Sequence, residues 1–390
     1  MNIALFSDTY VPEINGVAAS TSNLAHVMMS HGHQCIVVTS NPYSNEVTFE
    51  DGVIRIPGFD MKRYYGYNMA FSNPKAMKII ERFRPDIVHC QSDGGMGIFG
   101  PQVAKKLHIA CVYTFHTMVE DYTYYVTGGH FDRAARQFVR TFYQTSLQRF
   151  DHLIAPSDKI LDYLRSIDID HTVSVIPTGI EFERFSIENR NAKDVAALKK
   201  ELGIAPDDYV ITILGRIAKE KSIDVLLRGY KAFLEEGESR PTKMVITGFG
   251  PAEEELKTLA GELGIKDHVI FTGKCAPNET QRYYHLGDCF ASASLSETQG
   301  LTYMEAMAAS LLVLARYDDN LVGTIQDGET GFFFFDEADF ASKLRSVMGF
   351  SATQKKRVIN NALKAIQPYS LEKFYQSVYE VYQRAIRKNW

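Results

Sequence analysis

The sequence predicts an α/β protein made of two doubly wound, Rossmann-like domains. Short apolar runs alternate with longer amphipathic stretches, which is typical of parallel strands joined by crossover helices, and this series restarts near the middle of the chain. A chain of 390 residues is also too long for one ordinary core. It fits two domains of roughly 150–200 residues each.

The expected strands form two series, one in each half of the chain. The first series is Ile3–Phe6, Cys35–Thr39, Ile87–Cys90, Ala110–Phe115, His152–Ala155 and Val173–Ile176. The second series is Tyr209–Leu214, Lys243–Thr247, His268–Thr272, Asp288–Ala291, Leu312–Ala315 and Phe332–Phe335. Helical stretches separate most of these runs, so each series predicts its own parallel sheet.

The domain boundary is expected at Pro177-Thr178-Gly179, where a strand ends in turn residues. This gives an N-terminal domain of residues 1–178 and a C-terminal domain of residues 179–368. Residues 369–390 contain a last helix, at about Leu371–Lys388, whose apolar residues recur at near-helical spacing. We expect this helix to pack back on the first domain.

Composition and charge exclude several classes of protein. The hydrophobic share of 45% and the charged share of 23% are those of a soluble globular protein. A net charge of −5 argues against general nucleic-acid binding, which needs a basic face. The chain starts with an apolar strand rather than a signal-like segment, and no apolar stretch is long enough to span a membrane. We therefore expect a cytoplasmic protein.

The cysteines support the same location. They are few, odd in number and widely spread, at Cys35, Cys90, Cys111, Cys275 and Cys289. Most lie in apolar runs and none forms a CxxC pair, so we expect reduced, buried thiols and no metal site.

Two glutamates with seven residues between them, Glu297 and Glu305, are the most informative feature of the chain. Leu301–Ala309 consists of good helix formers, and Gly300 belongs to the loop before it. A helix N-terminus attracts phosphate, so carboxylates on either side of it could bind the hydroxyls that flank a pyrophosphate in a nucleotide sugar. The alternative for Glu305 alone is a simple interaction with the helix dipole.

A basic loop follows the first strand of the second series. Gly215 lets the backbone approach a ligand, and Arg216 and Lys221 supply two positive charges before a helix that starts near Ser222. Parallel sheets bind ligands at the carboxyl ends of their strands, so two such domains are expected to face each other across a cleft. There the loop could neutralise a leaving pyrophosphate without a metal ion. An ordinary solvated loop is the alternative.

Three further strand-to-loop junctions carry weaker signals. Asn15-Gly16 could form a tight turn whose backbone N–H groups face a phosphate. His116 follows a strand and should lie at the cleft, although a histidine satisfied by backbone is the alternative. Gly248-Phe249-Gly250-Pro251 places Pro251 at a first helical position, but Glu253 stands where a nicotinamide-binding motif has its last glycine. This argues against a dehydrogenase.

Taken together, these motifs resemble the retaining glycosyltransferases of family four, which have the GT-B fold. The resemblance rests on the two glutamates, the loop from Gly215 to Lys221, Asn15-Gly16-Val17, Pro177-Thr178-Gly179-Ile180 and the segment Phe271–Gly331. Within the family, Ser296–Thr302 and Arg316–Leu321 are most similar to bacterial diacylglycerol α-glucosyltransferases. One difference is Ser310-Leu311-Leu312-Val313, where the family usually has Gly-x-Pro-Val.

The resemblance implies a role for each matching residue. Arg216, Lys221 and the backbone of Gly300, Leu301 and Thr302 would bind the donor diphosphate, with Gly16 under the phosphates. Glu305 would bind the ribose, Glu297 the donor sugar, and His116 would lie near the reacting carbon. The resemblance implies hexose transfer with retention of configuration, with UDP-glucose as the expected donor and no required cofactor. The first domain offers no evident carboxylate nucleophile, which favours front-face attack.

The acceptor implied by the resemblance is a lipid such as diacylglycerol. Met61–Tyr67 mixes basic and aromatic residues, and tyrosines precede an amphipathic stretch that carries several arginines: Tyr122, Tyr124, Tyr125, Arg133, Arg136, Arg140 and Arg149. Such segments can rest on an anionic membrane, here the inner face of the cell membrane. The alternative is a tyrosine-rich core surface beside a solvated helix.

Other readings of the motifs stay open at this stage. A transferase with a soluble sugar or protein acceptor would share every donor residue, and a nucleotide-sugar epimerase or a non-enzymatic sensor would share the fold. Asp168-Ile169-Asp170 resembles the metal-binding D-x-D of another glycosyltransferase fold, but its place between a helix and a strand indicates a surface turn.

Overall fold

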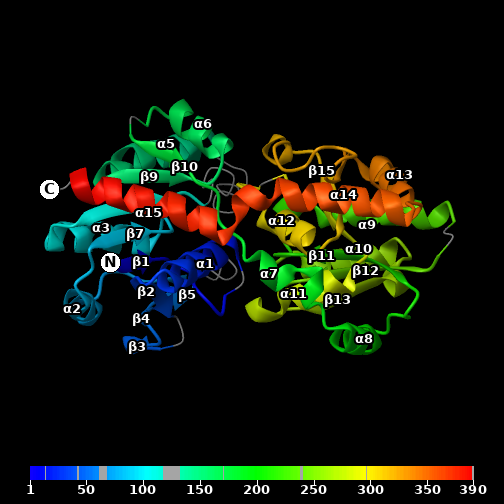
Figure 1. Cartoon of the computed structure of the whole chain (residues 1–390), viewed down its shortest axis with the longest axis horizontal. Helices are drawn as coiled ribbons and strands as arrows, with labels where there is room; N and C mark the ends of the chain where they lie inside the picture. Colours follow the sequence, from blue (N-terminus) through cyan, green and yellow to red (C-terminus); the bar gives the residue numbers. More distant parts are fainter. Residues whose placement is uncertain are drawn as a thin grey trace. The chain divides into compact units, whose positions relative to one another are not determined.

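The computed structural model describes residues 1–13, 15–41, 44–60, 68–116, 132–169, 171–237, 240–295 and 297–388. It divides the chain into two compact units (Figure 1). The first unit combines Met1–Gly179 with Leu371–Trp390, and the second is Ile180–Ser370. Each unit is built around its own parallel sheet, which confirms the predicted fold class.

The first unit contains an eight-stranded sheet with the order β10-β9-β8-β7-β1-β2-β4-β3. Its strands are β1 (Asn2–Phe6), β2 (Gln34–Asn41), β3 (Thr48–Glu50), β4 (Val53–Pro57), β7 (Ile87–Cys90), β8 (Ala110–Thr114), β9 (His152–Ala155) and β10 (Val173–Val175). All neighbours are parallel except β3, which pairs antiparallel with β4. Two short strands, β5 (Phe59–Asp60) and β6 (Asn68–Met69), form a separate antiparallel pair. The sequence patterns did not reveal β3 to β6.

Strand residues of the first unit alternate between two apolar clusters, one on each face of the sheet. Leu5 and Val112 belong to the cluster that contains residues of α1 (Gly16–Ser30) and α15 (Leu371–Lys388). Phe6 and Tyr113, the next residues along the same strands, belong to the other cluster. That cluster includes residues of α2 (Pro74–Phe83), α3 (Gly95–Leu107), α5 (Asp132–Ser146) and α6 (Asp158–Ser166). This period of two is that of a sheet covered on both faces.

The last helix, α15, packs on the first unit as expected. Its apolar residues Phe374, Val378, Val381, Tyr382 and Ala385 are buried in the same cluster as the core residues of α1 and β1. Figure 1 draws it in red, next to the strands of this unit. The chain therefore leaves the first unit at Gly179 and returns to it at Leu371.

The second unit contains a six-stranded parallel sheet with the order β13-β12-β11-β14-β15-β16. Its strands are β11 (Tyr209–Leu214), β12 (Thr242–Thr247), β13 (Val269–Gly273), β14 (Cys289–Ser292), β15 (Leu312–Arg316) and β16 (Phe332–Phe334). Every strand predicted from the second series is present, with ends that differ by no more than a residue or so.

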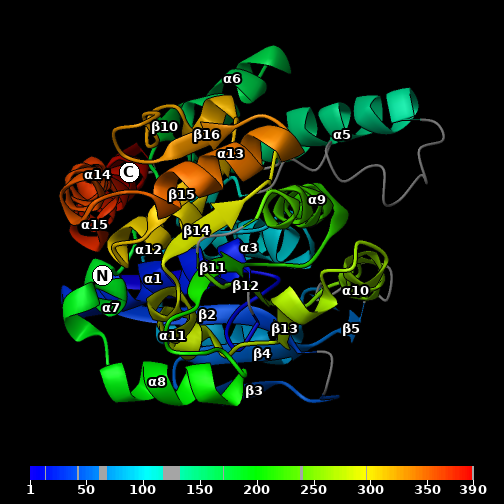
Figure 2. The same ribbon diagram turned by 90° about the vertical axis from the view of Figure 1, so that its right-hand side faces the viewer.

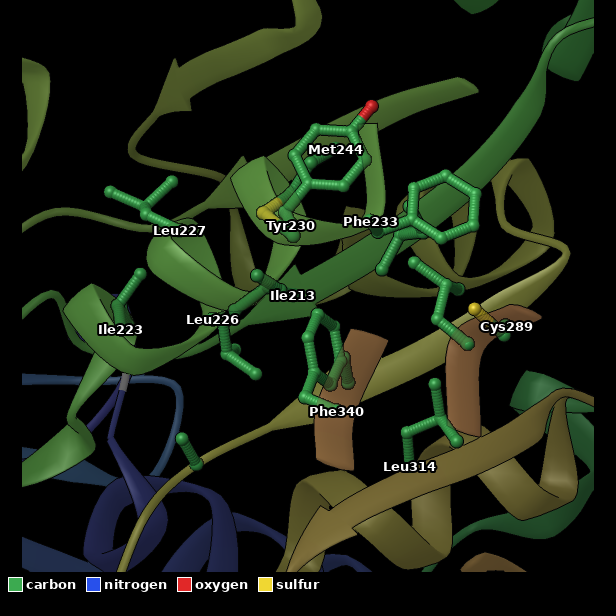
Figure 3. Packing of buried hydrophobic residues seen from close by; sticks show 14 of the residues in the cluster. Ile213, Ile223, Leu226, Leu227, Tyr230, Phe233, Met244, Cys289, Leu314 and Phe340 are labelled. Atoms are coloured by element: carbon green, nitrogen blue, oxygen red, sulfur yellow. The ribbon is translucent and has the colours of Figure 1, made fainter. Parts of the chain in front are cut away.

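Helices cover both faces of this second sheet. Figure 2 shows α9 (Ile223–Glu235), α10 (Glu253–Glu262) and α13 (Glu337–Met348) on one side. On the other side it shows α7 (Phe182–Phe185), α8 (Ala192–Glu201), α11 (Thr280–Leu286), α12 (Leu301–Ala308) and α14 (Ala352–Ala365). Figure 3 shows how Leu226 and Tyr230 of α9 pack with Met244, Leu314 and Phe340, which come from two strands and α13.

Two turns in the second unit differ from the sequence predictions for Pro251 and for the turn at Ser310. Pro251 lies before α10 rather than at its first position, because the helix begins at Glu253 with Ala252 as its N-cap. Ser310, which stands where the related family usually has glycine, takes a left-handed conformation with φ of 61°. Its N–H donates to the Met307 carbonyl, so the tight turn between α12 and β15 forms despite the side chain. The strain costs about 1 kcal/mol.

The loops after β11 and β12 are joined through their backbones. Ile217 N–H donates to the Phe249 carbonyl at 3.0 Å, and Ala252 N–H donates to the Ile217 carbonyl at 3.1 Å. A Cβ atom on Gly248 would lie only 1.9 Å from the carbonyl oxygen of Gly215, and φ at Gly248 is 143°. The predicted basic loop is thus held in place by a neighbour that has to be glycine.

We predict that Gly248→Ala lowers the free energy of unfolding by about 2–4 kcal/mol, because the added methyl group collides with backbone in a disallowed conformation. Gly261→Ala is the matched control, because Gly261 lies in α10 with open space around a Cβ atom. That change should stabilise by about 0.5–1 kcal/mol. Urea unfolding of both variants measures the difference, and equal stabilities would contradict this account of the two loops.

Candidate functional site

The N-terminus of α12 is the centre of the candidate site in the second unit. Gly300 is the N-cap, with φ of 79°, and the helix begins at Leu301. A Cβ atom on Gly300 would lie 2.9 Å from side-chain atoms of Leu321 and Tyr303, so glycine is needed both for the conformation and for space. The helix start predicted from the sequence is present, and it offers backbone N–H groups to an anion.

Lys221 and Glu297, two of the predicted site residues, are in direct contact. Lys221 Nζ lies 2.7 Å from Glu297 Oε1 and 3.4 Å from Ser294 Oγ. The two side chains are only 25% and 16% exposed. The Asn320 side chain also donates a hydrogen bond to the Glu297 backbone carbonyl. The basic loop after β11 and the loop after β14 therefore meet through an ion pair that solvent screens only partly.

Arg216 is also paired with a carboxylate. Its guanidinium donates to Glu220, four residues further along the same loop, and the two side chains are 26% and 14% exposed. Gly215, just before it, has φ of 145° and no atom near a Cβ position. Both cations assigned to the diphosphate thus have a carboxylate partner in this structure.

Glu305 lies within α12, where the helix faces α11. Tyr284 donates its hydroxyl hydrogen to Glu305 Oε2 at 2.7 Å. Burial raises the pKa of Glu305, while the Tyr284 hydrogen bond and the charge of Arg184 act in the opposite direction. The carboxylate is therefore held by one side chain and kept largely away from water.

Sequence reasoning missed the partners of these residues. Glu220 follows two basic loop positions, and no sequence motif marks it as the partner of Arg216. Tyr284 and Arg184 come from segments far from Glu305 in the sequence. Asn320 lies in the segment that resembles the diacylglycerol enzymes, which was the one available signal. Such partners are set by which helices and strands pack together, and no local spacing encodes that.

In the first unit, Asn15 and Gly16 begin helix α1. Asn15 Oδ1 accepts from the Ala18 N–H at 2.9 Å, and Asn15 Nδ2 donates to Thr9 Oγ1 at 2.7 Å. Asn15 is thus an N-cap, and Gly16 is the first helical residue. The segment is a helix start, which is the arrangement that can receive a phosphate.

His116 follows β8 and is hydrogen-bonded to a side chain. Its Nε2 lies 2.7 Å from Gln91 Oε1. Burial lowers the pKa of His116 to about 4, so the imidazole is neutral at neutral pH. Gln91 itself follows β7, the strand next to β8 in the sheet.

Most of the basic and aromatic residues predicted to contact a membrane, together with Asp170, fall outside the described residues. Met61–Tyr67, Tyr122, Tyr124, Tyr125 and Asp170 lie outside the described ranges, and so do the side chains of Arg133 and Arg136. Arg140 donates to the Ser166 carbonyl at 2.6 Å, and Arg149 is exposed.

The cysteines are free thiols, of which Cys90, Cys111, Cys275 and Cys289 are buried. Cys35 is only partly buried, so the expectation of burial was wrong for it, because it lies near the start of β2. Within the described ranges, no cluster of three or more metal-ligating side chains occurs. None of the helices described there has the length and apolar character needed to cross a bilayer.

Comparison with known proteins identifies both halves of the chain. A model of Glycosyltransferase Family 4 matches residues 14–184, and a model of glycosyl transferases group 1 matches residues 194–365. The alpha-monoglucosyldiacylglycerol synthase of Streptococcus pneumoniae is 35% identical, over 100% of this chain and 87% of that protein. The enzyme of the same name from Acholeplasma laidlawii is 33% identical, over 100% of this chain and 98% of its own.

Solved structures share the fold. Sucrose-phosphate synthase from Thermosynechococcus elongatus superimposes with a TM-score of 0.74 at 18% identity, covering 98% of each chain. Anabaena HepE in complex with UDP-glucose superimposes with a TM-score of 0.73 at 15% identity, covering 98% of this chain and 99% of its own. Because a relative above 30% identity aligns with the entire chain and both halves match the corresponding family models, this protein belongs to glycosyltransferase family 4, with the GT-B fold, and is a nucleotide-sugar-dependent glycosyltransferase.

Proposed function

We propose that this enzyme transfers glucose from UDP-glucose to diacylglycerol at a membrane surface, with retention of the anomeric configuration. The observation that carries the proposal is the Lys221–Glu297 pair beside the N-terminus of α12, in a chain whose relatives at 33% and 35% identity are both named alpha-monoglucosyldiacylglycerol synthases. The pair supplies groups for a diphosphate and a sugar, and the relatives point to the lipid.

The donor diphosphate binds where the two cations are. Arg216 and Lys221 take its negative charge, and the N–H groups of Gly300, Leu301 and Thr302 add the partial charge of a helix start. In the free protein each cation is paired with a carboxylate, Glu220 or Glu297. Diphosphate binding then exchanges one anion for another, so neither guanidinium nor ammonium has to be buried without a partner.

Two glutamates fix the rest of the donor. Glu297 accepts hydrogen bonds from the sugar hydroxyls when Lys221 turns to the diphosphate. Glu305 accepts from the ribose hydroxyls, and the hydrogen bond from Tyr284 leaves its second carboxylate oxygen for this purpose. We assign His116 to the donor sugar near the reacting carbon and Gly16 to the phosphates, in the roles that the family resemblance implies.

Catalysis is mostly electrostatic in this proposal. Negative charge grows on the departing nucleotide diphosphate while the bond to the sugar breaks, and Arg216, Lys221 and the helix N-terminus, once bound to the diphosphate, stabilise that charge. The acceptor hydroxyl attacks from the same face, and the leaving phosphate accepts its proton. This scheme gives retention and requires neither a metal ion nor another cofactor.

A lipid acceptor requires the enzyme to bind a membrane surface. We propose that the basic and aromatic segments of the first unit contact anionic lipid on the cytoplasmic face, as a peripheral protein does. A soluble sugar or protein acceptor is the second candidate function, because it would use the same donor residues. An epimerase or a sensor is no longer a candidate, because the chain matches transferase models over both halves.

Product analysis tests the proposed function directly. Radiolabelled UDP-glucose is incubated with diacylglycerol in vesicles, or with soluble sugars and proteins, and the products are separated. We expect label in a lipid-soluble product with an α-linkage. Label only in a soluble product would establish the second candidate. Label that stays in the nucleotide sugar under every condition would refute transfer from UDP-glucose.

We predict that Arg216→Ala lowers kcat by roughly 10²–10³-fold, because a preorganised charge at the leaving group is lost. UDP affinity should fall much less, because Lys221 and the helix start remain. Lys219→Ala is the control. Lys219 lies in the same loop, but its side chain is 66% exposed and its ammonium lies as far as 4.0 Å from the Glu255 carboxylate. Its kcat should equal that of the native enzyme. An Arg216→Ala enzyme with full turnover would show that Arg216 is misassigned.

We predict that the protein sediments with vesicles that contain anionic lipid and much less with neutral vesicles. Replacing Arg133 and Arg136 by glutamine should weaken this binding. Replacing Lys199 and Lys200 of α8 by glutamine removes the same charge from the second unit and should leave vesicle binding unchanged. Absence of sedimentation with either kind of vesicle would remove the membrane from the proposal.

A further inference from the structure

A chain of buried hydrogen bonds connects α15 to His116 inside the first unit. Tyr382 of α15 lies with its hydroxyl 2.7 Å from Nδ1 of His89, and Nε2 of His89 lies 3.0 Å from Nε2 of Gln91. The other end of the same amide, Gln91 Oε1, lies 2.7 Å from Nε2 of His116. Tyr382, His89 and Gln91 are each no more than 1% exposed. The donor-site residues considered so far do not explain why such a polar chain is buried here.

The Gln91 amide couples the protonation of the two imidazoles. An amide nitrogen only donates and an amide oxygen only accepts. With the oxygen towards His116, Nε2 of His116 has to carry a proton. With the Gln91 nitrogen towards His89, Nε2 of His89 has to be unprotonated. The ring proton of His89 is then on Nδ1, which donates a hydrogen bond to the Tyr382 hydroxyl. Thr114 Oγ1 lies 2.7 Å from the same Nε2 of His89, so in this tautomer the Thr114 hydroxyl and the Gln91 amide share its single lone pair as donors.

Both imidazoles are neutral in this arrangement. Burial lowers the pKa of His89 to about 3 and that of His116 to about 4. A neutral imidazole has one donor nitrogen and one acceptor nitrogen, so fixing one of them fixes the other. In His116 the proton on Nε2 leaves the lone pair on Nδ1.

We propose that Gln91 is a positioning residue that holds His116 as the neutral tautomer with its proton on Nε2, so that Nδ1 accepts a hydrogen bond from a substrate hydroxyl. The inference rests on the proposed function, in which His116 contacts the sugar. It limits what His116 can recognise to a group that donates a hydrogen, as the hydroxyls of a hexose or of a glycerol lipid do. His89 and Tyr382 support Gln91 from the other side and do not touch substrate.

The tautomer itself is measurable without any activity. In protein labelled with ¹⁵N-histidine, protonated and bare ring nitrogens resonate in separate ranges, and His116→Asn identifies the signals of His116. We expect Nε2 of His116 and Nδ1 of His89 to be protonated. A proton on Nδ1 of His116 would overturn the proposal, because it requires the Gln91 amide to face the other way.

Substitutions at Gln91 test the link to the reaction. Gln91→Leu removes both contacts, and we expect kcat to fall about tenfold, the usual effect of losing one polar contact, with the KM for UDP-glucose nearly unchanged. Gln91→Glu still offers an acceptor to His116, so it should keep the proton on Nε2 and recover most of the lost kcat. In the same variant His89 should change tautomer, because Nε2 now faces an acceptor.

A matched control separates positioning from general stability. His152 is another buried histidine of the first unit, with Nε2 2.9 Å from Ser174 Oγ, and burial lowers its pKa to about 4. Ser174→Ala breaks that hydrogen bond and should leave both kcat and the His116 spectrum unchanged. Equal losses of kcat in Ser174→Ala and Gln91→Leu would reduce Gln91 to a structural residue.

The outcomes distinguish this inference from the proposed function. If the native protein lacks transferase activity but shows the expected tautomers, the function fails and the coupling through Gln91 stands. If activity is normal and His116 has the opposite tautomer, the coupling fails and the function stands. If Gln91→Leu does not fold, the native spectrum and Gln91→Glu still decide.

Discussion

The parallel order of the strands is the constraint on which both candidate sites depend. In a parallel sheet every carboxyl end lies at the same edge, so residues far apart in the sequence meet there because of chain winding alone. Lys221 follows β11 and Glu297 follows β14, and these two strands are neighbours. Gln91 and His116 are related in the same way, because they follow the neighbouring strands β7 and β8. Side-chain chemistry then refines contacts that the topology has already arranged.

Pairing of opposite charges is the second common theme. The cations of the candidate site are held by carboxylates in partly buried positions, and the partly buried Glu305 is held by a tyrosine hydroxyl. Buried ionic groups are costly when they lack a partner. The free protein therefore keeps these charged groups in place at little cost in stability, and in the proposed function the ligand replaces their carboxylate partners.

The sequence predicted the central strands well, because strands buried on both faces are continuous apolar runs. It did not reveal β4, whose residues alternate between buried and half-buried, or β3, which is mostly exposed. Glu297, Lys221 and the start of α12 could be found from spacing. Gln91 and Tyr284 could not, because their importance comes from pairing between elements. The turn at Ser310 shows the same limit, since its left-handed backbone follows from tertiary structure.

The position of α15 has a consequence for biosynthesis. The second unit is one continuous stretch, Ile180–Ser370, and can close its core as soon as the ribosome has released it. The first unit begins earlier but needs Val378 and Tyr382 to cover Leu5 and Val112. One face of its sheet thus stays uncovered until α15 has been synthesised. A chain that stopped before Leu371 would lack α15 and so damage the first unit, while the second unit, Ile180–Ser370, would keep its whole stretch.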